Sequence, residues 1–162
     1  MNFKIFMRSV LGAVVLCLLF IWLQDILSGE EGRVRKFILR GKQAVETKDF
    51  FACADIVSAS YSDKYGNSRE TLLYATKEFF GYYKEIFVNI ESMEINFDEA
   101  KTKASVEIVA LVIGKTQQNN AEKILEGNKG RFRIKLIKEE KKWYLLELEF
   151  FEPITVMGQN IS

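Results

Sequence analysis

The chain has 162 residues, of which 48% are hydrophobic and 28% charged, and it contains a single proline, a composition typical of one globular domain with or without an appendage. Its 23 lysines and arginines nearly balance its 22 aspartates and glutamates, so net charge indicates neither a nucleic-acid partner nor an acidic substrate. Histidine is absent, which excludes histidine-dependent triads and most catalytic zinc sites, and Cys17 and Cys53 are too few for a disulfide framework or a thiolate metal cage. We therefore expect neither a metal nor a cofactor.

An apolar run near the start of the chain is its first strong feature. Residues 10–23 read VLGAVVLCLLFIWL, preceded by Lys4 and Arg8 and followed by Asp25, the first acidic residue. Basic residues before such a run and acidic residues after it predict a membrane segment with its N-terminus in the cytoplasm. The side chains expected in the bilayer are those of Val10, Leu11, Val14, Val15, Leu16, Leu18, Leu19, Phe20, Ile21, Trp22 and Leu23.

This run fits a retained single-pass anchor or a cleaved signal peptide. Its length lies between the roughly 20 residues of a spanning helix and the roughly 7–15 of a signal core. Trp22 at the outer end and a weak cleavage pattern around Ser28 favour retention over cleavage. A buried helix of a soluble domain is disfavoured, because the run is apolar all round and the rest of the chain can form its own core. We expect a cytoplasmic stub and anchor over residues 1–29, one periplasmic or extracellular domain over 30–153, and a tail over 154–162.

Three helices are predicted after the anchor. Ser28 and Glu31 fit a capping box, and Asp49 and Ser68 are N-cap residues for the second and third helices. Apolar residues at helical spacing define one face of each helix. These residues are Val34, Phe37, Ile38, Gly41, Ala44 and Val45 in the first, Phe50, Ala54 and Val57 in the second, and Leu72, Thr76, Phe79 and Tyr83 in the third.

From Glu85 onward the apolar period changes to two, which predicts four strands. In the first strand the phase slips between Ile90 and Met93, so we expect a β-bulge near residues 91–92. The second strand spans residues 104–112 and the third 121–138, and a tight turn at 139–141 leads into the fourth, at 142–152. The pattern predicts an α+β fold with three helices packed on one face of a curved, antiparallel four-stranded sheet.

The order of these elements resembles the nuclear transport factor 2-like superfamily, whose domains have a cone-shaped α+β fold. The resemblance covers about residues 30–153 and depends on the KDF that opens the second helix, the YSDKYG turn and the closing hairpin RFRIKLIKEEKKWYLLELEF. The superfamily contains isomerases, dehydratases, small-ligand binders and interaction domains, so the resemblance implies a fold and leaves the function open.

Catalysis is the function that the residues support least. Ketosteroid-isomerase-like chemistry needs a carboxylate base and an oxyanion donor in an apolar site. The acids available are Asp63 and Asp98, and the donors are Tyr61, Tyr65, Tyr82 and Tyr83, but no spacing places an acid and a tyrosine together. The resemblance implies that dehydratases of the superfamily use histidine, which is absent. We therefore expect no enzyme, and we expect Cys53 to be a buried apolar residue.

Two kinds of binding remain as hypotheses. A cavity for a small apolar ligand is one, with Phe79, Tyr83, Met93 and Trp143 as candidate lining residues, although the same residues suit a filled core.

Assembly through the sheet is the favoured hypothesis. Trp143, Leu145 and Phe151 fall in one phase of the last strand and Tyr144, Leu146, Leu148 and Phe150 in the other, so both faces are expected to be apolar and covered. We expect protein interaction without catalysis, as a homodimer or with another envelope protein and with no nucleic acid. An anchored domain of this fold resembles, in architecture, the bitopic core component of type IV secretion channels. The interface candidates are Leu145, Leu146, Leu148 and Phe150.

The charge pattern around the apolar run predicts the topology. A reporter fused after Ser162 should be active only when it functions outside the cytoplasm, because Lys4 and Arg8 hold the N-terminus inside. The matched control is the same fusion to a reporter that functions only in the cytoplasm, and activity of that control would contradict the prediction.

Overall fold

The computed structural model describes residues 29–117 and 123–153. The chain divides into two compact units, residues 1–36 and 37–162. The described part of the first unit is a helical segment with an ion pair of 2.9 Å between Arg33 and Glu30 and one of 2.8 Å between Arg35 and Glu31. The predicted membrane segment lies outside the described residues, and within them no helix has the length and apolar character needed to span a membrane.

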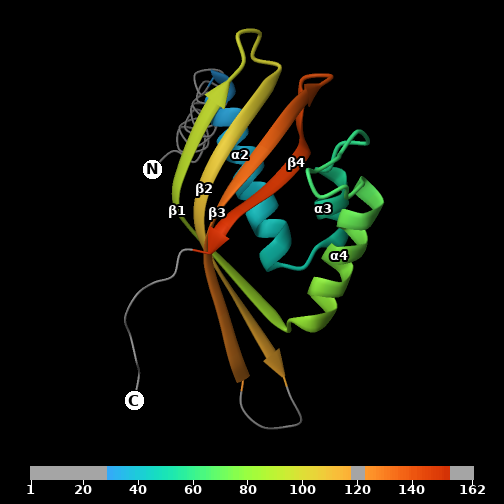
Figure 1. Ribbon diagram of the computed structural model, residues 1–162, viewed down its shortest axis with the longest axis vertical. Helices are drawn as coiled ribbons and strands as arrows, with labels where there is room; N and C mark the ends of the chain where they lie inside the picture. The colour runs from blue at the N-terminus through green and yellow to red at the C-terminus, as the bar shows by residue number, and fades with distance from the viewer. Residues whose placement is uncertain (1–28, 118–122, 154–162) are drawn as a thin grey trace, which may run out of the picture. The chain divides into compact units, whose positions relative to one another are not determined.

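The described elements follow the predicted order of helices and strands (Figure 1). Side-chain caps begin two helices as predicted: Asp49 accepts a hydrogen bond of 2.9 Å from the backbone N–H of Ala52, and Ser68 accepts one of 3.4 Å from that of Thr71. The elements are α2 (Gly29–Glu46), α3 (Phe50–Asp55), α4 (Arg69–Tyr82), β1 (Glu85–Phe97), β2 (Lys103–Gln117), β3 (Lys123–Glu139) and β4 (Lys142–Pro153).

The four strands form one antiparallel sheet in the order β1-β2-β3-β4. The predicted β-bulge in β1 is confirmed, because Ile90 pairs with Ala110 while Ser92 pairs with the next residue, Val109. This extra residue keeps the apolar side chains of both halves of β1 on the same face as the buried residues of β2. The predicted α+β class is therefore confirmed over the described residues.

A second bulge, at Leu146 in β4, corrects the facing predicted for the last strand. Leu145 pairs with Leu136 and Glu147 with Lys135, so Leu146 is the extra residue. The bulge places Trp143, Leu145, Leu148 and Phe150 together on the face toward the helices, and it places Tyr144, Glu147 and Glu149 on the outer face. The prediction that Leu145 and Leu148 lie on opposite faces is wrong, because it assumed an unbroken alternation.

The outer face of β4 is consequently charged. Glu147 pairs with Lys135 at 2.8 Å, and Arg133 lies 3.5 Å from Glu149 and 2.8 Å from Glu107 on β2. Two apolar faces were the premise for self-association through this strand, and that premise does not hold. Self-association itself stays a prediction.

The opposite face of the sheet is covered by α3, α4 and the part of α2 from Phe37 onward. Helices and sheet meet in a buried cluster formed by Ala44, Cys53, Phe80 and Ile86. Burial raises the pKa of the Cys53 thiol, and the charge of Asp49 raises it further. Both effects disfavour the reactive thiolate.

The free edge of β4 is also covered, by the segment that follows α3. The backbone N–H of Ser58 donates to the carbonyl of Leu145 at 2.9 Å, and that of Ser62 donates to the carbonyl of Leu146 at 3.1 Å. Covering an edge in this way removes the unpaired backbone groups through which sheets associate.

Trp143 tests the corrected facing of β4. Its side chain is 6% exposed and its ring centroid lies 6.0 Å from that of Phe97. Trp143→Ala should lower the free energy of unfolding by about 3–5 kcal/mol, because it deletes a large buried aromatic side chain. Tyr144→Ala, on the outer face of the same strand, should cost about 1 kcal/mol or less. Chemical denaturation of the full-length variants measures both, and equal losses would contradict this facing.

Candidate ligand-binding site

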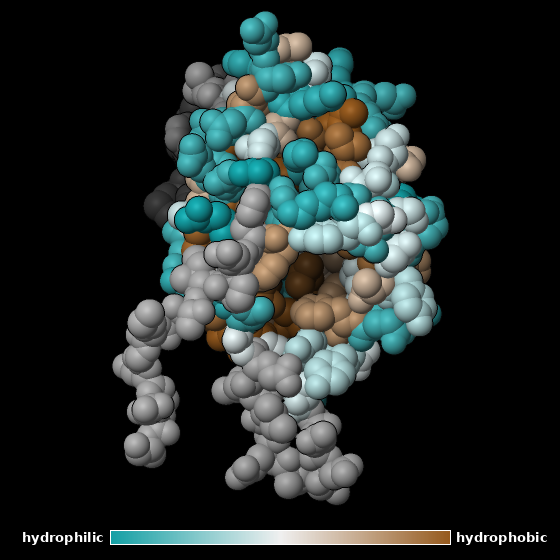
Figure 2. All heavy atoms as spheres, in the orientation of Figure 1, coloured by the Kyte–Doolittle hydropathy of each residue, from teal (hydrophilic) through white to brown (hydrophobic). Residues whose placement is uncertain are grey.

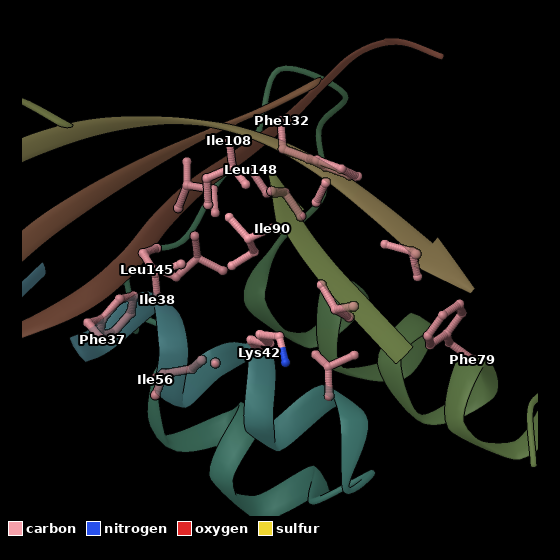
Figure 3. A pocket seen from close by; sticks show the side chains of 16 residues that line it. Phe37, Ile38, Lys42, Ile56, Phe79, Ile90, Ile108, Phe132, Leu145 and Leu148 are labelled. Carbon is pink, nitrogen blue, oxygen red and sulfur yellow. The ribbon is translucent and has the colours of Figure 1, made fainter. Parts of the chain in front are cut away.

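A cavity of about 380 Å³, called here the main cavity, lies between the helices and the sheet. In Figure 3 Ile90, Ile108 and Leu148 point from the sheet toward α2, with Phe37 at one end and Phe79 of α4 at the other. The helical side of its wall consists of Phe37, Ile38, Gly41, Lys42, Val45, Ile56 and Phe79, and the sheet contributes Val88, Ile90, Ile108, Ala110, Val112, Phe132, Ile134, Leu145 and Leu148.

Lys42 is the one ionisable residue among the described residues of this wall. Its ammonium group lies 2.6 Å from Oε2 of Glu46, whose Oε1 accepts a hydrogen bond of 2.9 Å from the backbone N–H of Val88. Partial burial raises the pKa of Glu46. The hydrogen bonds from Lys42 and Val88 and the charge of Lys42 together lower it by more, so the pKa lies below its usual value. Glu46 thus stays ionised and holds the ammonium, while the alkyl stem of Lys42 lines the cavity.

A second cavity of about 420 Å³, called here the end cavity, adjoins the first. Phe79, Val112 and Phe132 line both. Figure 2 shows a hollow with a hydrophobic floor between the end of β4 and α4, which agrees with a cavity walled by residues of those two elements. The remaining lining residues of the end cavity are Tyr83, Gly114, Gly127, Asn128 and Phe150.

Two glycines allow aromatic rings to lie directly on the sheet around the end cavity. A Cβ atom at Gly114 would lie 2.2 Å from ring carbons of Tyr83, and one at Gly130 would lie 2.6 Å from the ring of Phe150. Any larger residue at either position would therefore have to displace a ring that borders the cavity.

The predicted lining residues separate into two groups. Phe79 lines both cavities and Tyr83 lines the end cavity, whereas Met93 and Trp143 line neither. Both lie on the helix-facing side of the sheet. Trp143 is at the end opposite Tyr83, because it directly follows the β3–β4 turn whereas Tyr83 packs on Gly114, and Met93 pairs with Ile108 of the main cavity without lining the cavity itself.

The predicted interface residues are also placed by the bulge in β4. Leu145 and Leu148 line the main cavity and Phe150 lines the end cavity. Leu146 is the bulged residue itself. Four lining residues of α2, Phe37, Ile38, Gly41 and Val45, were identified in the sequence only as part of one apolar face, because periodicity does not distinguish a cavity wall from a filled core. Lys42 was not identified.

One acid and one tyrosine from the predicted catalytic candidates do meet. Tyr61 donates a hydrogen bond of 3.3 Å to Asp63, a contact that spacing alone did not predict. Burial raises the pKa of Tyr61 to about 12, and the charge of Asp63 and the hydrogen bond to it contribute. Partial desolvation raises the pKa of Asp63, but hydrogen bonds from Asn67, Tyr65 and Tyr61 outweigh it and leave the pKa below its usual value.

Neither cavity contains the predicted acids. Asp98 accepts hydrogen bonds from Thr102 and Lys103 in the β1–β2 turn, and these bonds, led by that from the Lys103 backbone, lower its pKa. Asp63, Asp98, Tyr61, Tyr65 and Tyr82 are all absent from the two linings. Across the part of the chain that the structure describes, no cluster of three or more acidic or cysteine side chains is placed to hold a metal ion.

No family model matches the chain, and no curated protein matches its sequence. Solved structures do match. A protein from Novosphingobium aromaticivorans that carries the provisional name scytalone dehydratase aligns with a TM-score of 0.66 and 14% identity, over 80% of this chain and 89% of that one. A nuclear transport factor 2-like superfamily protein from Salmonella enterica aligns with a TM-score of 0.66 and 11% identity, over 84% and 99%.

A hexachlorocyclohexane dehydrochlorinase, LinA type 2, aligns with a TM-score of 0.62 and 14% identity, over 83% of this chain and 94% of that one. At such identities the likeness shows the fold alone. The chain therefore has the nuclear transport factor 2-like, or cystatin-like, fold, and the names of several neighbours belong to enzymes.

The contact between Gly114 and Tyr83 makes the wall of the end cavity testable. Gly114→Ala should lower the free energy of unfolding by about 1–3 kcal/mol, because its Cβ would overlap the ring of Tyr83. Gly81→Ala, in α4 with nothing within 4 Å of the added Cβ, is the matched control and should stabilise the protein by up to about 1 kcal/mol. Denaturant titration compares the two, and a neutral Gly114→Ala would contradict the packing.

Proposed function

We propose that this protein binds a small apolar ligand in the main cavity and does not transform it. The observation that supports this most directly is a cavity of about 380 Å³ whose wall is carbon apart from one tethered lysine. Ligand sites are commonly concave, apolar and of this size. Burial of an apolar ligand there removes its surface from water, which supplies the binding free energy.

An enzyme of the dehydratase or isomerase type is the second candidate, favoured by the names of the structural neighbours. Such chemistry needs a base within hydrogen-bond reach of the substrate. The described residues that line the two cavities include only two ionisable side chains, Lys42 and Tyr83, and the ammonium of Lys42 is paired with Glu46. This arrangement supports binding over catalysis.

Protein interaction and membrane anchoring complete the proposal. The outer face of the sheet still carries an apolar group, with Phe87 47% exposed and Val109, Leu111 and Ile113 half-buried. This group supports protein association through β1 and β2 in place of association through β4, whose outer face is charged. The apolar run at residues 10–23 supports anchoring of the domain at the outer side of a membrane.

Filling the main cavity tests the proposed function. The uncharged dye N-phenylnaphthylamine should bind the full-length protein saturably, with a rise in fluorescence over the carrier buffer alone. Ala110 is buried and lines the cavity, so Ala110→Leu places the added carbons in the space that the dye would occupy. We expect at least about tenfold weaker binding, the effect of losing about 1.4 kcal/mol.

Val109→Leu is the matched control, because the neighbouring side chain on β2 lies on the outer face and is absent from both linings. It should bind the dye like the unmodified protein. No saturable signal from the unmodified protein, or equal binding by Ala110→Leu, would count against a ligand site in this cavity.

A further inference from the structure

We propose that one ligand spans both cavities, and that it is a neutral amphiphile with its apolar body in the main cavity and a single hydroxyl, carbonyl or amide end group in the end cavity. This inference rests on the proposed ligand-binding function and adds the chemical class of the ligand and its direction in the site. It follows from the unequal distribution of hydrogen-bonding groups between two cavities that share Phe79, Val112 and Phe132.

The main cavity offers a polar group no partner. Every lining residue that the structure describes is apolar except Lys42, and the Lys42 ammonium is held by Glu46 at 2.6 Å. A ligand hydroxyl placed there would lose its hydrogen bonds to water and gain none, which is costly. The part of the ligand that lies in the main cavity must therefore be hydrocarbon.

The end cavity supplies the missing partners. Asn128 brings an amide with both donors and an acceptor, and Tyr83 brings a phenolic hydroxyl. The backbone adds more, because β3 pairs only with β2 between Lys123 and Lys129 among the described strands, and its pairing with β4 begins at Gly130. The N–H and C=O groups on that side of β3 have no partner among the described strands. One polar end group of a ligand can be satisfied here.

The end group should carry no charge. Among the residues whose side chains the structure describes, no lysine, arginine, aspartate or glutamate lines the end cavity. The lysines next in sequence to its lining residues Gly114 and Asn128 are engaged elsewhere, since Lys115 pairs with Glu85 at 2.8 Å and Lys129 with Glu91 at 2.7 Å. A carboxylate in this cavity would thus have no counter-ion among the described lining residues.

Displacement of N-phenylnaphthylamine from the full-length protein tests the class of ligand. Three competitors of one chain length are compared: a primary alcohol, the diol with a hydroxyl at each end, and the carboxylate. The alcohol should displace the dye at a concentration at least about tenfold lower than either of the others, because only it leaves no polar or charged group unsatisfied. A diol or a carboxylate as effective as the alcohol would overturn the inference.

Variants locate the end group. Asn128→Leu combined with Tyr83→Phe should weaken displacement by the alcohol at least about fivefold, because hydrogen-bond partners are lost while the Tyr83 ring keeps its place on Gly114. Asn89→Leu makes one of the same substitutions on the outer face, where Asn89 pairs with Leu111, and should leave displacement unchanged. Unchanged displacement in the double variant would contradict the assigned head-group site.

Photolabelling reads the direction of the ligand without any substitution. An alcohol with a diazirine at its apolar end should label residues 37–45, and the isomer with the diazirine beside the hydroxyl should label residues 79–83 or 127–132. The reverse pattern would overturn the inference. Failure of the dye to bind at all would instead defeat the proposed function, so the two ideas fail separately.

Discussion

The structure depends on collecting the large apolar side chains of the four strands on one face of the sheet. Strict alternation cannot achieve this in β1 or β4, because the apolar phase of each sequence slips once. A bulge at Glu91 and another at Leu146 absorb the slips. Everything on the helix side follows from them: the wall of the main cavity, the burial of Trp143 at the other end, and the charged outer face on which Arg133 meets Glu107 and Glu149.

The gathering of apolar side chains on one face of the sheet also explains why the cavity walls carry few polar groups. Ion pairs form on the outer face or at the helix surface, where their desolvation is small and their net contribution to stability is modest. Lys42 is an exception, because it lies in the wall of the main cavity. Glu46 pairs with its ammonium group and also accepts a hydrogen bond from the backbone N–H of Val88 on β1. Among the described lining residues, the other polar side chains are those of Tyr83 and Asn128, and both belong to the end cavity.

Local signals allowed most of the fold to be predicted. Asp49 and Ser68 each cap a helix by accepting a hydrogen bond from a backbone N–H three residues later, so both caps were predictable. The slip between Ile90 and Met93 is visible in the alternation of apolar residues, so the first bulge was predictable too. The bulge at Leu146 was hidden because apolar residues occupy both phases of LLELEFF. An error of one residue there put Leu148 and Phe150 on the wrong face of the strand. Both were therefore predicted to lie in an interface, whereas they line the cavities.

The cavity itself was not predictable from periodicity, because a stripe of apolar residues describes a face and not the space opposite it. One of the residues that line the main cavity, Ala110 on β2, is small, and a larger side chain there would extend into the open volume. Well-packed interiors contain few voids larger than a water molecule. An apolar stripe therefore could not distinguish such a filled interior from a space of about 380 Å³ between the helices and the sheet.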